Sequence, residues 1–157
     1  MSDKQIGFDP QWLSIIQFNL LSQNSNTPPN FDSMKIQSFE TNSQIRIGTN
    51  VEKKLARVEL LTEIKTVSKD NAQKEASANF HFSLIYKIEN MDSLVQEDEK
   101  KIVILDSSLA GSFAAVSYST TRGFLITHLK STLFKDFILP VIDANKLLQN
   151  ELPLEEK

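Results

Sequence analysis

The chain has no cysteine among its 157 residues. It therefore forms no disulfide bond and offers no thiolate metal ligand or thiol nucleophile, and its composition is compatible with a reducing compartment. The first segment, MSDKQIGFDPQW, lacks the positively charged start and the apolar core of a secretory signal peptide. Together these absences predict a cytoplasmic protein.

Glycine is scarce as well, with four in the chain, and none belongs to a phosphate-binding loop or a Gly-x-Ser-x-Gly elbow. The two histidines, His81 and His128, lack the His-x-x-x-His spacing of a zinc site. Two histidines alone also fall short of a three-ligand site. The acids at 97–99 form a solvated charge run rather than a catalytic pair. No motif therefore predicts catalytic residues, a cofactor or a metal, and we expect a protein that is not an enzyme.

Neither charge nor hydrophobicity is concentrated in one part of the chain. The formal net charge is −3, and lysines alternate with acids without the basic stripe that marks nucleic-acid binding. The uncharged run 107–121 has fifteen residues and is rich in Ser and Thr, whereas a membrane-spanning helix needs roughly 20 predominantly apolar residues. We expect no nucleic-acid partner and no membrane insertion.

What the chain does have is period-two alternation, which predicts β-strands over residues 13–22, 34–48, 53–67 and 78–89. The clearest faces are Ile16, Phe18 and Leu20 in the first segment, and Phe80, Phe82, Leu84, Tyr86 and Ile88 in the last. The other face of the last segment is polar, so the sheet packs mainly on one side. The short connections favour antiparallel pairing.

Two details of this pattern predict irregularities. Within 53–67, the alternation of Val58 and Leu60 slips in phase before Ile64. Between the first two strands, residues 23–33 are polar, rich in Asn and contain two consecutive prolines. Such a composition is typical of a long surface loop.

Helical spacing begins after the acidic stretch 90–101, which we interpret as a solvated loop or a frayed helical turn. Leu109 and Phe113 recur at helical spacing behind a candidate N-cap at Asp106 or Ser107. We expect a kink or a break over residues 117–123, because Ser, Thr and Gly are weak helix formers.

The last part of the chain contains two further signals. Pro140 stops helix continuation and favours an extended segment before it, and Asp143 is a candidate N-cap for a short helix through Leu148. We therefore expect helices within 106–135 and 143–149. The fold class is α+β, a four-stranded antiparallel sheet followed by helices packed on one side. Residues 1–157 form one domain, with flexible tails at 1–12 and 150–157.

Two features remain outside this scheme. Ala110, Gly111, Ala114 and Ala115 place small residues one helical turn apart, which permits close approach of either this chain's own sheet or another subunit. Ten phenylalanines, two tyrosines and one tryptophan are present, and several lie in linking segments. Core packing accounts for most of them, but Phe31, beside two prolines, is hard to bury and could line a groove for apolar ligands.

The order of the elements and the C-terminal residues resemble the SecB family of export chaperones. The shared features are a main helix ending near Thr132-Leu133, an extended Leu139-Pro140-Val141, and a short helix with Asp143-Ala144 and Leu147-Leu148. The stretch VSYSTTRGF at 116–124 also looks like a helical region of SecB-like proteins. The resemblance covers roughly residues 13–150.

This resemblance implies an ATP-independent holdase without a cofactor. SecB-like proteins form dimers that pair into tetramers through a strand edge and a small-residue helix, and they hold unfolded polypeptides in long apolar grooves. By this resemblance, subunit contacts are expected at Ala110, Gly111, Ala114 and Ala115. Candidate client-binding residues are Trp12, Phe18, Phe31, Phe137, Ile138 and Val141.

The chain also departs from the family. The strand that provides an acidic contact for the SecA motor ATPase aligns with NFHFSLIYKI, residues 79–88, which contains no acid. The sequence therefore does not predict coupling to a motor. Two other hypotheses stay open: an adaptor of the same fold for one dedicated partner, such as an antitoxin, and a small-ligand binder or enzyme on an α+β sheet.

Overall fold

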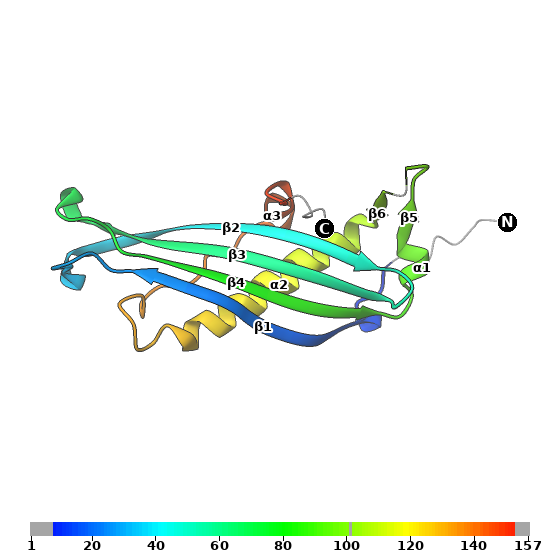
Figure 1. Cartoon of the computed structure of the whole chain (residues 1–157), viewed down its shortest axis with the longest axis horizontal. Helices are drawn as coiled ribbons and strands as arrows, with labels where there is room; N and C mark the ends of the chain where they lie inside the picture. Colours follow the sequence, from blue (N-terminus) through cyan, green and yellow to red (C-terminus); the bar gives the residue numbers. More distant parts are fainter. Residues whose placement is uncertain (1–7, 101, 153–157) are drawn as a thin grey trace.

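The structure is a computed structural model that describes residues 8–100 and 102–152. Its centre is a four-stranded antiparallel sheet, as predicted, in the order β1-β4-β3-β2. The strands are long: β1 is Leu13–Asn26, β2 is Ile36–Asn50, β3 is Leu55–Ser68 and β4 is Ser77–Ile88. Since β1 and β2 are the two edges, the crossover loop 27–35 carries the chain across the end of the sheet (Figure 1). This loop contains the 3-10 turn Ser33–Lys35.

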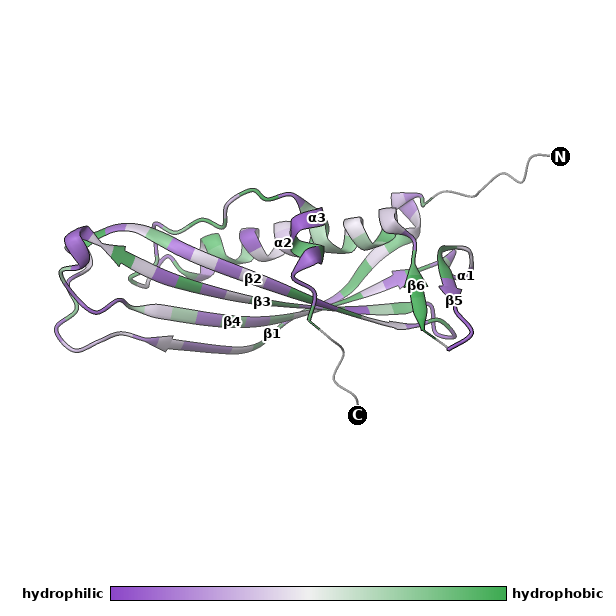
Figure 2. Cartoon of the chain, turned by 90° about the horizontal axis from the view of Figure 1, so that it is seen from above, coloured by the Kyte–Doolittle hydropathy of each residue, from purple (hydrophilic) through white to green (hydrophobic). Residues whose placement is uncertain are grey.

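The helical layer covers one face of the sheet. Helix α2, Ser107–His128, runs diagonally across that face, and the shorter α3, Ala144–Gln149, lies beside it (Figures 1 and 2). The Asp106 side chain accepts hydrogen bonds from the Ser108 and Leu109 amides at 2.9 and 3.2 Å, and Asp143 caps α3 in the same way. The predicted helical ranges and the fold class are therefore confirmed.

The apolar strand faces and α2 form one core. Its largest fully buried side chains include Tyr86, Phe82, Phe113 and Ile45. Tyr86 and Phe113 lie with ring centroids 4.9 Å apart, which joins β4 to α2. Burial of aromatic side chains of this size contributes much of the stability of such a core.

Helix α2 continues through residues 117–123, so the predicted break is wrong. Ser117 and Thr121 are fully buried on the face toward the sheet, where small side chains let the helix approach the strands. The Tyr86 hydroxyl and Ser117 Oγ lie 2.7 Å apart. This tertiary contact outweighs the weak helix propensity of the segment.

The strand pattern also needs corrections. Strand β3 has no phase slip, because Thr62 is buried and continues the inward face from Leu60 to Ile64. Strand β1 runs to Asn26, so residues 23–26 belong to it and not to the loop. Its register shifts between Ile15 and Gln17, a β-bulge that leaves Ile16 exposed rather than on the face of Phe18.

The acidic stretch is more ordered than expected. The helical turn α1, Met91–Leu94, is followed by a two-stranded hairpin of β5, Val95–Glu97, and β6, Val103–Leu105. The Asp98 side chain accepts hydrogen bonds from the Lys100 and Ile102 amides and so closes the turn. The expected tails lie partly outside the described residues. Within them, Pro10–Trp12 form a 3-10 turn and Glu151 bridges to Ile45.

Candidate functional site: a groove along strand β2

A groove follows the first half of β2 on the helical side of the sheet. Its larger part has a volume of about 630 Å³ and lies between Ser33–Phe39 and the segment 130–136 that follows α2. A second, separate depression of about 210 Å³ lies further along β2, at Thr41–Ser43, and is lined by Pro140, Ile142 and residues of α3; the two depressions together are called the groove below. Two depressions in a row along one edge strand fit an extended chain better than a compact ligand.

An aromatic cluster joins β2 to the segment that follows α2. Phe39 of β2 contacts Phe134 and Phe137, with ring centroids 6.2 and 5.5 Å apart. Phe134 and Phe137 are almost fully buried, as is Leu139. These side chains fix the segment after α2 against the sheet, and Phe39 itself lines the groove.

The same segment exposes apolar side chains on its other side. Ile138 is 61% exposed and Val141 is 85% exposed. The Tyr118 hydroxyl donates a hydrogen bond to the Pro140 carbonyl oxygen at 2.8 Å, which holds this segment in place. Burial raises the pKa of Tyr118, although the charge of Arg122 lowers it, so the hydroxyl remains a donor. Exposed apolar residues on a fixed segment are typical of a binding surface.

A second aromatic cluster lies between β1, β4 and the end of α2. Phe18 stacks on Phe82 with centroids 5.7 Å apart and contacts Phe124 at 5.5 Å. His128 stacks on Phe124 at 4.8 Å, and its Nε2 lies 2.7 Å from Gln23 Oε1. Sequence reasoning missed this contact, because the two residues are 105 positions apart. The adjacent pocket has about 260 Å³, less than the ~300–1,000 Å³ of typical small-ligand sites.

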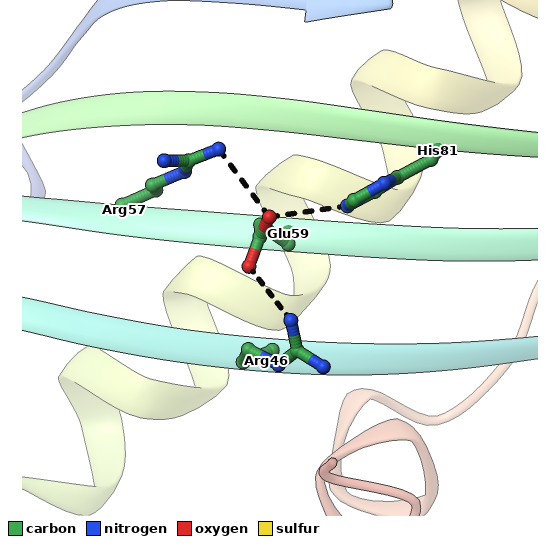
Figure 3. A network of polar contacts seen from close by, with 4 residues as sticks. All are labelled: Arg46, Arg57, Glu59 and His81. Atoms are coloured by element: carbon green, nitrogen blue, oxygen red, sulfur yellow. Dashed lines mark hydrogen bonds and ion pairs between the residues drawn. The ribbon is translucent and has the colours of Figure 1, made fainter. Parts of the chain in front are cut away.

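The opposite face of the sheet carries a polar network centred on Glu59 (Figure 3). Glu59 Oε2 lies 3.3 Å from Arg46 Nη1, while Oε1 lies 3.3 Å from Arg57 Nη2 and 3.1 Å from His81 Nε2. The Glu59 side chain is only 14% exposed. Two arginines and one histidine thus surround a single carboxylate in this part of the sheet.

The predicted client-binding residues lie in three places. Phe137, Ile138 and Val141 are next to the groove in the chain, between and beside the lining residues 130–136, Pro140 and Ile142, but are not among the residues that line it. Phe31 is partly buried in the crossover loop. Phe18 belongs to the second aromatic cluster. Trp12 lies at the far end of the sheet, because the neighbouring Leu13 pairs with Ile88, whereas the crossover end pairs Asn26 with Ser77.

The predicted subunit-contact residues lie on different sides of α2. Ala114 is fully buried within its own chain, Ala115 is exposed, and Ala110 and Gly111 are partly exposed. A Cβ atom added at Gly111 would meet no atom within 4 Å. The packing of this chain alone therefore does not require glycine at position 111.

Residues 8–100 and 102–152 contain no group of three or more His, Cys, Asp or Glu side chains that could hold a metal ion. Burial raises the pKa of Tyr86 to about 12, despite its hydrogen bond with Ser117, so this hydroxyl stays protonated. None of the described helices is long and apolar enough to cross a membrane.

Comparison with known proteins supports the fold. Neither a family model nor a curated protein matches the sequence. The structure is similar to that of the Mycobacterium tuberculosis SecB-like chaperone Rv1957 in complex with a ChAD peptide from the Rv1956 HigA1 antitoxin. The TM-score is 0.62 at 10% sequence identity, and the match covers 84% of this chain and 91% of that chain. The α+β fold of this chain is thus similar to that of a SecB-like chaperone.

A second structure, a protein of unknown function from Streptococcus agalactiae, matches with a TM-score of 0.40 at 10% identity. The match covers 83% of this chain and 95% of the Streptococcus chain.

Proposed function

We propose that this protein is a SecB-like, ATP-independent chaperone that holds non-native polypeptides along β2 and on the exposed apolar residues of the neighbouring segment. The observation that carries the proposal is the position of Ile138 and Val141, which are exposed on a segment fixed by Phe134, Phe137 and Tyr118. A client would bury these side chains without any rearrangement of the core. The similarity in fold to a SecB-like chaperone supports the same role.

The proposed binding is modest in strength and tolerant of sequence. Apolar burial contributes roughly 25 cal/mol per Å², and ordering an unfolded client opposes it. The chaperone would act in the cytoplasm as a dimer or tetramer, without a nucleotide, a cofactor or catalytic residues. Coupling to a motor ATPase is not part of the proposal, because the Glu59 network is rich in basic groups.

The test is the suppression of aggregation of several unrelated denatured proteins, diluted into stoichiometric amounts of the pure protein without nucleotide. We expect Ile138→Ser and Val141→Ser each to weaken client binding about threefold, since each removes apolar surface from the contact, with little dependence on salt. Phe31→Ser should act in the same direction. Phe137 is a poorer test position, because its burial couples a substitution there to folding.

Ile104→Ser is the matched control. Ile104 is 53% exposed on β6, a strand of the separate hairpin, so this change removes a similar apolar side chain away from the groove. It should leave client binding unchanged. If the unmodified protein leaves all the test proteins to aggregate at the control rate, the general holdase function is wrong.

The second candidate is an adaptor for one dedicated polypeptide. The similar Mycobacterium structure is a complex with a peptide from an antitoxin, and the same groove could serve one such partner. Breadth of clients separates the two: an adaptor would bind one polypeptide tightly and fail to protect unrelated proteins.

A further inference from the structure

Strand β2 is an edge strand whose outer side is already occupied at one point. The Leu152 amide donates a hydrogen bond to the Ile45 carbonyl oxygen at 2.7 Å, and Glu151 forms a parallel bridge with Ile45. In an antiparallel strand, main-chain groups point alternately to its two sides. The main-chain groups of Thr41 and Ser43 therefore point to the same open side as those of Ile45.

The occupied point lies at the end of the groove. Thr41–Ser43 line its smaller part from one side, and Leu147 and Asn150 line it from the other. An extended segment that pairs with Thr41 and Ser43 advances ~3.3 Å per residue and next reaches Ile45. There it meets the C-terminal segment of the chain itself.

The C-terminal segment is anchored by α3 before this point, and its described contact with Ile45 consists of one hydrogen bond and one bridge. Leu147 is almost fully buried and anchors α3, and the Asn150 and Glu151 amides close a turn onto Leu147 and Leu148. Partial burial raises the pKa of the Glu151 carboxyl, in line with its place against the sheet. These two contacts open at lower cost than the docked helix before them.

We propose that the open edge of β2, from Thr41 to Ile47, is a strand-addition surface for an extended polypeptide, and that Glu151 and Leu152 occupy it until such a segment displaces them. The inference rests on the proposed chaperone function and specifies how the client is held. Main-chain pairing is independent of the client's side chains and so explains tolerance of sequence. The chain's own segment covers an edge that would otherwise pair with other copies. Because a client must first displace this segment, its apparent affinity is lower than it would be for a free edge.

The first experiment compares Leu152→Pro with Leu152→Ala. Proline removes the amide hydrogen that bonds to Ile45, whereas alanine keeps it and loses a similar amount of side chain. The probe is a permanently unfolded, carboxymethylated protein with a fluorescent label, titrated against each full-length variant. We expect Leu152→Pro to bind about threefold to tenfold more tightly than Leu152→Ala, as loss of one competing hydrogen bond allows.

A reversible disulfide bond that fixes the C-terminal segment to β2 provides the second measurement. Gln44 and Asn150 each precede a bridged residue, and the chain has no cysteine, so Gln44→Cys with Asn150→Cys introduces a single possible disulfide. Oxidation should lower the affinity for the unfolded probe, and reduction should restore it. Equal affinity in both redox states, or equal affinity of the two Leu152 variants, contradicts the inference while the proposed function stands. Absence of binding by every variant, including the unmodified protein, contradicts both.

Discussion

At the scale of single residues, Glu75 holds the turn between β3 and β4. Its carboxylate accepts hydrogen bonds from Thr66 Oγ1 at 2.6 Å, from the Ser68 amide at 2.9 Å and from Ser68 Oγ at 3.1 Å. The neighbouring Gln73 side chain accepts from the Asp32 amide and donates to the Asp32 carbonyl oxygen, at 2.9 and 3.0 Å. The turn and the crossover loop beside the groove are thereby joined.

Replacing Glu75 with glutamine tests this arrangement. Burial raises the pKa of Glu75, but the hydrogen bonds from Thr66 and Ser68, with the charge of Lys65, lower it below the ordinary 4.5. A carboxyl whose pKa is lower in the folded chain stabilises the fold above its unfolded pKa, and this contribution is lost as pH falls through the folded value. We expect Glu75→Gln to lower the free energy of unfolding by about 1 kcal/mol at neutral pH.

Urea denaturation at neutral pH and below pH 4.5 measures the effect. The difference between Glu75→Gln and the unmodified protein should narrow at the lower pH, because the carboxylate of the unmodified protein then becomes protonated. Glu52→Gln is the control, since Glu52 is exposed in the β2–β3 turn. A gap between Glu75→Gln and the unmodified protein that stays constant with pH would show that the charge of Glu75 does not matter.

At the scale of elements, α2 contains two glycines that its own packing does not need. Gly111 and Gly123 both lie inside the helix, and a Cβ atom at either position meets nothing within 4 Å. Glycine in a helix interior costs about 0.5–1 kcal/mol relative to alanine, because the unfolded chain loses more freedom on folding. The chain therefore keeps two weak points in its longest helix.

Gly123→Ala should stabilise the isolated chain by about 0.5–1 kcal/mol. The measurement is the midpoint of chemical denaturation, with an unchanged slope as evidence that the unfolded state is the same. Gly111→Ala is the second glycine substitution that α2 offers, with the same expected gain, because the space around both glycines is open. Destabilisation by Gly123→Ala would mean that the helix backbone is more crowded than the structure shows.

The elements also show what sequence reasoning can and cannot find. Four strands and two capped helices are predictable, because apolar alternation and the Asp106 and Asp143 caps are local signals. The burial of Thr62 escapes prediction, since a threonine on an inward face looks like a break in the pattern. The order of strands is not predictable in this way, because it depends on pairs such as Leu13 with Ile88 that are distant in sequence.

The candidate site is predictable only in part. Ile138 and Val141 stand out in the sequence because they flank Pro140 in a segment too apolar for a simple loop. The contact of Phe39 with Phe137 and the bridge of Glu151 to Ile45 join segments about a hundred positions apart. No local pattern in a single sequence encodes such pairs.

At the scale of the whole molecule, the chain is an elongated sheet with helices on one face (Figure 2) and the polar network of Glu59 on the other. Apolar side chains remain exposed at the β1 edge, where Ile15, Ile16 and Leu21 are 42%, 55% and 44% exposed. An exposed edge strand with apolar residues tends to pair with another chain. Helix α2, through which we also expect subunit contacts, is a second surface for assembly besides the β1 edge.

The last prediction concerns assembly. We expect at least a dimer at micromolar concentration, with Gly111 near a subunit contact, and Gly111→Leu should shift the protein toward the monomer. The open space around Gly111 within the chain means that leucine there should leave the fold intact while it blocks close approach of a second backbone. Thr127→Leu is the control, an exposed position of α2 roughly 24 Å further along the helix. Light scattering gives the mass of each variant, and a monomeric unmodified protein, or a Gly111→Leu variant of unchanged mass, would contradict the prediction.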